Sequence, residues 1–246
     1  MRAGRIHNFG SPEVIVLEEM PKPVPAAGEV LVRIKAAGVG PWDGLIRAGK
    51  SALPQPLPLT LGSDIAGTVE AMGAGVSGLS VGDAVFGVSN ARFTDGYAEY
   101  AAASAGMIAR KPKKLGFPEA ASMPVIAVTA WQMLFEQARL TRGQTVLVHG
   151  AAGNVGRFAV QLARRQRLHV LATASAPDID DLRRLGANDV IDFRSTRFER
   201  TVAPVDAVLD LVGADVQDRS FSVLKPGGVL VSAVSSPDQD KAREHG

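Results

Sequence analysis

Short apolar segments, broken by glycine and proline, dominate the first half of the chain. Five of them have the length and β-branched content typical of strands. They cover residues 14–17, 29–36, 64–71, 83–88 and 96–101. Proline-rich connectors at 21–25 and 54–58 and a glycine-rich stretch at 73–82 separate several of these segments. Many short strands with turn signals between them predict a small β-barrel or sandwich over residues 1–117.

The pattern changes after residue 117, where apolar and amphipathic segments alternate. An Ala-rich helix is predicted over 118–138, with Pro118 at its start and Pro124 beginning or kinking a second segment. The strands predicted after it are 145–149, 169–174, 190–193, 207–212 and 228–234, and the helices are 156–167, 179–185 and 217–224. This alternation predicts an α/β domain over residues 118–246, with a parallel sheet covered on both faces.

Composition narrows the classes of function. The 246 residues are 46% hydrophobic and 21% charged, as in an ordinary soluble globular protein. The chain has no cysteine, which removes disulfides and thiolate zinc ligands. Its four histidines, His7, His149, His169 and His245, are scattered along the sequence, so their spacing predicts no metal site.

Charge and hydropathy exclude two kinds of partner. The net charge is +2 and the basic residues are scattered, which argues against a nucleic-acid surface. No apolar run reaches the roughly 18 residues of a membrane span, and the N-terminus lacks the apolar core of a signal peptide. We therefore expect a cytoplasmic protein that binds neither nucleic acid nor membrane.

The most informative segment is TVLVHGAAGNVG at 145–156, an apolar strand that enters a glycine-rich turn before a helix. It matches G-x-G-x-x-G with Ala151 at the first glycine position. Small residues let the backbone approach a pyrophosphate, and the N–H groups at the start of the helix attract its charge. The residues predicted to bind it are Ala151, Gly153, Asn154, Val155 and Gly156. The alternative is a tight turn in an α/β protein that binds no nucleotide.

Two further positions belong to the same prediction. The strand at 169–174 ends without the Asp or Glu that an NAD site usually places beside the adenosine ribose. The small hydroxyl residues Thr173 and Ser175 leave room for a 2′-phosphate, which favours NADP(H) over NAD(H). Both residues are also compatible with an ordinary helix N-cap region. His149 lies in a predicted buried strand and is expected to be a core or cofactor-lining residue.

Motifs along nearly the whole chain carry a family resemblance. They are GRIHNFGSPEV at 4–14, PAAGEVLVRI at 25–34, AAGVGPWD at 36–43, LGSDIAGTVE at 61–70, VGDAVFG at 81–87, GYAEY at 96–100, TAW at 129–131, LGA at 185–187 and LKPGG at 224–228. The chain resembles the zinc-independent medium-chain dehydrogenase/reductases, in their quinone oxidoreductase-like branch. The resemblance implies a GroES-like β-barrel catalytic domain followed by a Rossmann-type cofactor domain.

The resemblance also implies an activity and the residues that serve it. The expected reaction passes hydride from a nicotinamide to a quinone or an α,β-unsaturated carbonyl, without zinc. The substrate-cleft candidates are Gly40, Trp42, Asp43, Asp64 and Phe93. The alternative for Trp42 and Phe93 is that they are core residues. The alternative for Asp43 and Asp64 is a structural role in orienting the loop. Thr129 is expected near the nicotinamide ribose, and Val212 and Gly213 on the nicotinamide side.

Departures from the family pattern leave a second interpretation open. Zinc members carry Cys in the active-site loop and a Gly-His-Glu segment, whereas this chain has 40–43 as GPWD and 62–64 as GSD. Quinone reductases often carry Asn at the position of Gly40 and Tyr at that of Leu45. A basic residue is expected at Pro177 or Asp178, and Tyr at Phe193. These losses favour the alternative of a non-catalytic NADPH-binding protein, either a sensor or crystallin-like.

The last residues depart furthest from the family. Residues 235–246 are polar and are expected to form a loop that enters a C-terminal part of the cofactor domain missing from this chain. An exposed sheet edge at that point would favour association, so a homodimer is expected.

Overall fold

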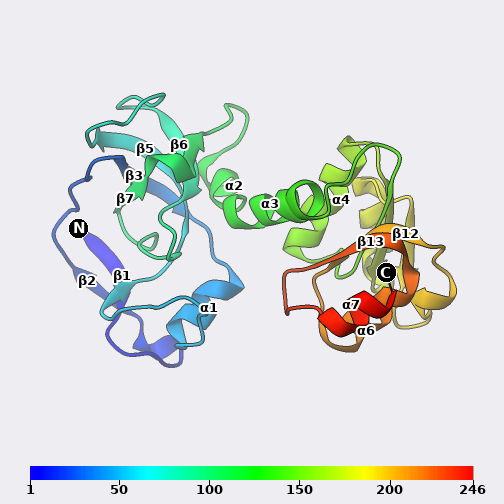
Figure 1. The fold of residues 1–246 in the computed structure, drawn as a ribbon. Coiled ribbons are helices and arrows are strands. Elements are labelled where there is room, and N and C mark those ends of the chain that lie inside the picture. The colour runs from blue at the N-terminus through cyan, green and yellow to red at the C-terminus, as the bar shows by residue number, and fades with distance from the viewer. Residues whose placement is uncertain (246) are drawn as a thin grey trace. The chain divides into compact units, whose positions relative to one another are not determined.

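Two units make up the structure, a computed structural model that describes residues 1–245, and they divide between Val125 and Ile126 (Figure 1). The sequence analysis placed the domain boundary after residue 117, which in the structure is the first residue of helix α2 (Phe117–Ala121). As a domain boundary, residue 117 stays a prediction. Among residues 1–245, no helix is both long and apolar enough to cross a lipid bilayer.

The first unit is built on antiparallel sheets. A five-stranded sheet has the order β7-β3-β5-β6-β8, and a three-stranded sheet has the order β2-β1-β4. The strands are β1 (Arg2–Ile6), β2 (Val16–Glu19), β3 (Glu29–Ala37), β4 (Leu59–Thr60), β5 (Asp64–Met72), β6 (Ala84–Val88), β7 (Tyr100–Ser104) and β8 (Ile108–Arg110). Alternate side chains of β3 and β5, including Val30, Val32, Ile65 and Val69, form its core.

Short elements of this unit were not assigned from periodicity. Strands β4 and β8 have two and three residues, too few to show an alternating pattern. Helix α1 (Pro41–Arg47) forms where the sequence suggested only a loop. Pro41 stands at its first turn, and the Asp43 carboxylate accepts the Gly40 N–H at 2.7 Å, which stabilises the start of the helix.

The second segment predicted to begin at Pro124 is present, and the stretch 118–138 is divided among three elements. The structure has α2, then α3 (Pro124–Trp131), and then a π-helical turn at Gln132–Gln137. Pro124 has no N–H to donate and restricts the residue before it, so the first helix ends and α3 begins at the proline.

The second unit contains a five-stranded parallel sheet, as predicted. Its strands are β9 (Thr145–Val148), β10 (His169–Ala174), β11 (Asp189–Asp192), β12 (Val205–Asp210) and β13 (Leu224–Ser232). The order β11-β10-β9-β12-β13 is 3-2-1-4-5 when the strands are counted within this unit, the arrangement of a dinucleotide-binding sheet. Helices α4 (Asn154–Arg165), α5 (Ile179–Leu185) and α6 (Ala214–Ser220) connect the strands. Ala159, Val160 and Ala163 bury the apolar face of α4.

Two expectations near the C-terminus are corrected. The helix predicted over 217–224 is α6, which ends at Ser220, and residue 224 already belongs to β13. Most of the expected polar loop is helix α7 (Gln239–His245), which lies beside α6 in Figure 1. The Asp238 carboxylate accepts the N–H groups of Asp240 and Lys241 and so caps the helix. Lys241 then forms an ion pair with Asp218 of α6 at 2.7 Å.

Candidate functional site

A cavity of about 530 Å³ lies at the carboxyl ends of β9, β10, β11 and β12. Its lining includes residues that follow each of those strands. Open parallel sheets bind ligands at this edge, where the strand order changes direction, which here is between β9 and β12. Four predicted cofactor residues line it, namely Gly153, Thr173, Ser175 and Val212. The sequence expected Ser175 and Val212 at opposite halves of the cofactor, and the structure places both on one cavity.

The glycine turn beside the cavity is tightly packed. A Cβ added to Gly156 would lie 2.5 Å from the Gly150 carbonyl oxygen and 2.6 Å from the Ala151 Cα, so no side chain fits there. Helix α4 therefore packs directly against the turn, as the spacing predicts. Ala151 is buried in the core, whereas Asn154 and Val155 begin the helix, where N–H groups lack intrahelical acceptors. These N–H groups fit an anionic pyrophosphate.

His149 connects three elements at the cavity. Its Nδ1 lies 3.0 Å from Thr173 Oγ1 on β10, and its Nε2 lies 3.1 Å from Ser220 Oγ on α6. The Ser220 hydroxyl donates to the Val216 carbonyl, so its oxygen is left to accept from Nε2–H. The Thr173 hydroxyl then donates to Nδ1. Burial lowers the pKa of His149 to about 4, so the ring is neutral at pH 7.

Asp210 fixes the loop that carries the predicted residues Val212 and Gly213. One carboxylate oxygen accepts the Val212 N–H at 2.9 Å and the Gly213 N–H at 2.8 Å. The other oxygen accepts from Gln217 and Ser232, each at 2.9 Å. Burial alone would raise the pKa of Asp210, but these donors hold it below its usual value. A buried carboxylate thus orients the cavity wall at the end of β12.

Other lining residues escaped the sequence analysis. They are Thr196, Arg197, Phe198, Asp215, Val216 and Arg219. Phe198 lies in the irregular connection between β11 and β12, where no periodic pattern marks a buried position, yet it packs edge-on against the His149 ring at 4.5 Å. Thr129 lies on α3 and Gly213 after β12, and neither is among the residues that line this cavity.

The substrate-cleft candidates all belong to the first unit, and one hydrogen bond joins two of them, Gly40 and Asp43. Asp43 accepts the Tyr97 hydroxyl at 2.9 Å in addition to the Gly40 N–H. Burial raises the pKa of Asp43, and the two donors only partly offset this effect. Trp42 donates its indole N–H to Ser63 at 2.9 Å. Their catalytic roles stay predictions.

Asp64 is buried, whereas Phe93 is half-buried. Asp64 is almost fully buried and accepts the Val125 N–H at 3.2 Å. Burial, together with the negative charge of Asp43, raises the pKa of Asp64 to about 7. Phe93 packs against the cluster that contains Ile6 and Ile46.

Comparisons with known proteins agree with this arrangement of elements. Residues 26–124 match the family model "Alcohol dehydrogenase GroES-like domain", and residues 154–242 match "Zinc-binding dehydrogenase". Human quinone oxidoreductase is 34% identical over 239 residues, which cover 94% of this chain and 72% of that protein. The chain belongs to the medium-chain dehydrogenase/reductases, in their quinone oxidoreductase-like branch.

Two more relatives illustrate the range of this family. A tomato (Solanum lycopersicum) 2-methylene-furan-3-one reductase is 37% identical over 250 residues, which cover 96% of this chain and 64% of that protein. A mycobacterial structure described as a complex with NADPH has a TM-score of 0.87 and 33% identity, and the match covers 100% of this chain and 79% of that chain.

The name of the second family model raises the question of zinc. The chain has no cysteine, and among residues 1–245 no group of three or more His, Asp or Glu side chains is placed to hold a metal ion. Ser63, in the segment that replaces Gly-His-Glu, is buried and accepts the Trp42 indole N–H. The residues present do not fit a catalytic zinc ion.

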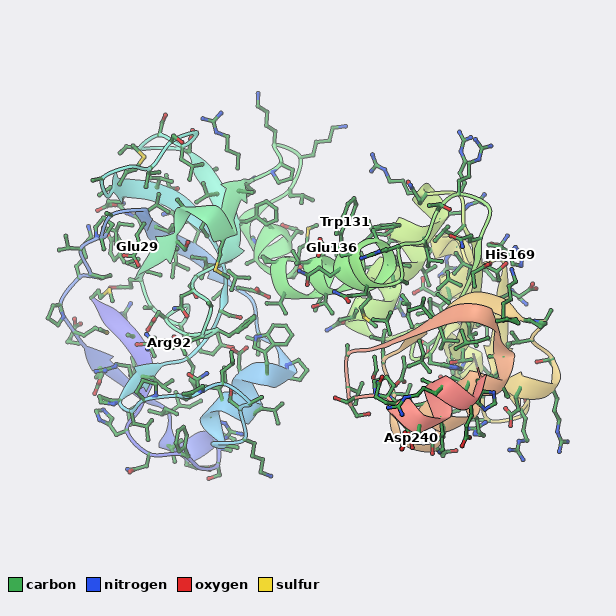
Figure 2. The ribbon with its side chains drawn as sticks, viewed as in Figure 1. Glu29, Arg92, Trp131, Glu136, His169 and Asp240 are labelled. Carbon is green, nitrogen blue, oxygen red and sulfur yellow. The ribbon has the colours of Figure 1, made fainter. Side chains whose placement is uncertain are left out.

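The first prediction concerns His149. Because its folded-state pKa of about 4 lies below the unfolded value of 6.5, the unfolded chain binds the proton more readily, and stability is lost as pH falls through that window. We expect this group to lower the free energy of unfolding by about 2 kcal/mol between pH 7 and pH 5. Urea titrations at both pH values should show a correspondingly smaller loss in His149→Gln. The exposed His169, at the surface in Figure 2, provides the control His169→Gln, and equal slopes in all three proteins would contradict the prediction.

The second prediction concerns Asp64, for which stability changes with pH in the opposite direction. Its folded-state pKa of about 7 exceeds its unfolded value of 3.8, so the folded state favours the protonated acid and stability is lost as pH rises through that window. Asp64→Asn should raise the free energy of unfolding at pH 8 by roughly 4 kcal/mol, and by much less at pH 4. The exposed Asp180→Asn is the control. A variant that is destabilised equally at both pH values would show that the charge of Asp64 is not the cause.

Proposed function

We propose that this chain is an NAD(P)H-dependent reductase that passes hydride to a quinone or to the β-carbon of an α,β-unsaturated carbonyl compound. The observation that carries the proposal is the cavity at the carboxyl ends of the parallel strands, with the Gly150–Gly156 turn on one side. The similarity to human quinone oxidoreductase and to the tomato 2-methylene-furan-3-one reductase supports both substrate classes.

In this proposal the chain binds and orients the cofactor, which supplies the hydride when bound. Gly153, Asn154, Val155 and Gly156 hold the pyrophosphate through backbone N–H groups, and Ala151 makes room for it. Thr173 and Ser175 face the adenosine ribose, Val212 and Gly213 line the nicotinamide side, and Thr129 lies near the nicotinamide ribose. The neutral His149 fixes Thr173 without adding charge to the cavity.

The substrate-side residues have supporting roles in this proposal. Trp42 and Phe93 contribute apolar walls, and Gly40 begins the helix that carries Trp42. Asp64 is buried and its raised pKa favours the protonated acid, whereas Asp43 accepts the Tyr97 hydroxyl and so orients Tyr97. A homodimer in the cytoplasm completes the proposal, supported by the position of β13 at an edge of the parallel sheet.

The third prediction tests cofactor binding. A ligand that binds only the folded state raises its stability by RT ln(1 + [L]/Kd), so millimolar NADPH should raise the melting temperature. Gly156→Asp should abolish that increase, because the side chain would collide with the Gly150 carbonyl and repel the pyrophosphate. The control is Gly106→Asp in the first unit, where the nearest atom to an added Cβ is 3.9 Å away. If neither NADPH nor NADH raises the melting temperature of the unmutated protein, the proposed function is wrong.

Turnover separates the enzyme from the alternative of a non-catalytic binding protein. Steady oxidation of NADPH in the presence of a simple quinone or enone supports the reductase. Binding without turnover across both substrate classes would favour the sensor or crystallin-like interpretation.

The fourth prediction is that this activity does not need zinc, since the donor atoms present do not fit the ion. NADPH oxidation should keep its rate after exhaustive dialysis against a chelator. Stoichiometric zinc in the purified protein, lost together with the activity and restored by zinc but not by magnesium, would contradict it.

The proposed cofactor preference is NADPH over NADH, by a small factor. Strand β10 ends at Ala174 with no acid at the ribose position, so nothing on the strand itself repels a 2′-phosphate. The expected basic and phenolic partners are absent, because Pro177, Asp178 and Phe193 occupy their positions. The arrangement of charges around Ser175 bears on the size of this preference.

A further inference from the structure

Three side chains form a hydrogen-bonded group at the cavity wall beyond β10. The Ser175 hydroxyl donates to one carboxylate oxygen of Asp178 at 2.8 Å. The other oxygen of Asp178 lies 3.5 Å from a guanidinium nitrogen of Arg157. Ser175 and Asp178 line the cavity, and both Arg157 and Asp178 are about one-third exposed. The single proton of the Ser175 hydroxyl is therefore committed to a carboxylate.

Arg157 occupies an unusual position for a cation. It is the fourth residue of α4, where the partial positive charge of the helix start disfavours a basic side chain. Its Nε–H donates to the Ala152 carbonyl at 2.9 Å, and its guanidinium also pairs with Asp181 of α5. Ala152 and Asp178 line the cavity, so the guanidinium lies directly behind the wall that they form.

Two arginines, unlike Arg157, do line the cavity, and both of them pair with Glu199. Arg197 pairs with Glu199 at 2.7 Å, and Arg219 pairs with Glu199 at 2.9 Å and with Asp215 at 3.0 Å. Hydrogen bonds connect neither arginine to Ser175 among the described residues 1–245. Arg157, by contrast, shares Asp178 with Ser175, which makes it the cation coupled to the ribose position.

We propose that Asp178 determines the choice between NADPH and NADH in this chain. Its carboxylate accepts the Ser175 hydroxyl and shares the positive charge of Arg157 with Asp181, and a ribose 2′-phosphate needs a hydroxyl donor and a cation of this kind beside it. The same carboxylate accepts a ribose 2′-hydroxyl, as an acid at the strand end does in NAD sites. Asp178 thus keeps the preference for NADPH small. This inference rests on the proposed function, since it concerns the same cofactor site.

The decisive variant is Asp178→Ala, because a gain in binding cannot result from misfolding. Removing the carboxylate frees the Ser175 hydroxyl, leaves Arg157 with Asp181 as its acidic partner, and removes a negative charge from beside the 2′-phosphate. A hydrogen bond to a charged acceptor then strengthens NADPH binding, and we expect its Kd to fall by about tenfold to a hundredfold. The Kd of NADH should stay unchanged or rise. Titration of both reduced cofactors by nicotinamide fluorescence measures this.

Controls identify the partners of Asp178. Asp180→Ala removes an acid two residues away that is 85% exposed and pairs with Arg183, so both Kd values should stay as in the unmutated protein. In the Asp178→Ala background, Arg157→Gln should cancel the gain for NADPH and leave NADH binding intact. Arg197→Gln in the same background should not cancel it.

The outcomes separate this inference from the proposed function. If Asp178→Ala leaves the NADPH to NADH ratio of Kd values unchanged, Asp178 does not set the preference. If Arg197→Gln cancels the gain and Arg157→Gln does not, the assignment of Arg157 is wrong. If the folded unmutated protein and Asp178→Ala bind neither cofactor, the proposed function itself fails.

Discussion

The close approach of backbone to backbone at the glycine turn is the constraint on which the cofactor unit depends. At Gly156 even a methyl group would lie 2.5 Å from the Gly150 carbonyl oxygen, so α4 can start only where it does if that position is glycine. The same contact places the first N–H groups of α4 beside the carboxyl end of β9. It also brings Gly150 close to the end of β12, since an added Cβ on Gly150 would lie 3.2 Å from the Val212 side chain. The turn therefore joins the halves of the sheet around one cavity.

Buried ionisable groups in the two units make stability depend on pH in opposite directions. Asp64 in the first unit favours its protonated form, and His149 in the second favours its unprotonated form, so both are uncharged over part of the range between about pH 4 and pH 7. Asp210 differs because four donors compensate its burial and keep it charged. The distinction is physical: a buried group stays charged where hydrogen bonds replace its hydration, and stays neutral where they do not.

The parallel sheet was predictable because strongly apolar strands of four to six residues alternate with helices along the chain. The glycine turn was predictable because it stands between such a strand, β9, and the amphipathic helix α4. Helix α7 was missed because its signal is one capping residue, Asp238, in an otherwise polar segment. Within the site, Gly153, Thr173, Ser175 and Val212 line the cavity. Steric and polar rules selected the first three, and the family resemblance selected Val212. Phe198 reaches the cavity from the connection between β11 and β12 and Arg219 from helix α6, and only the three-dimensional structure brings them together.

The ribose position shows why a rule about sequence spacing needs to be applied in space. The absence of an acid at the end of β10 is a correct observation about the strand. The chain nevertheless supplies a carboxylate four residues after the end of the strand, because the turn at Ala176–Asp178 folds Asp178 back onto Ser175. Arg157 from a different helix contacts that same carboxylate. The charge that a cofactor meets is thus set by three elements together, and its sign at the 2′-position depends on a balance between Asp178 and Arg157 that the strand alone does not contain.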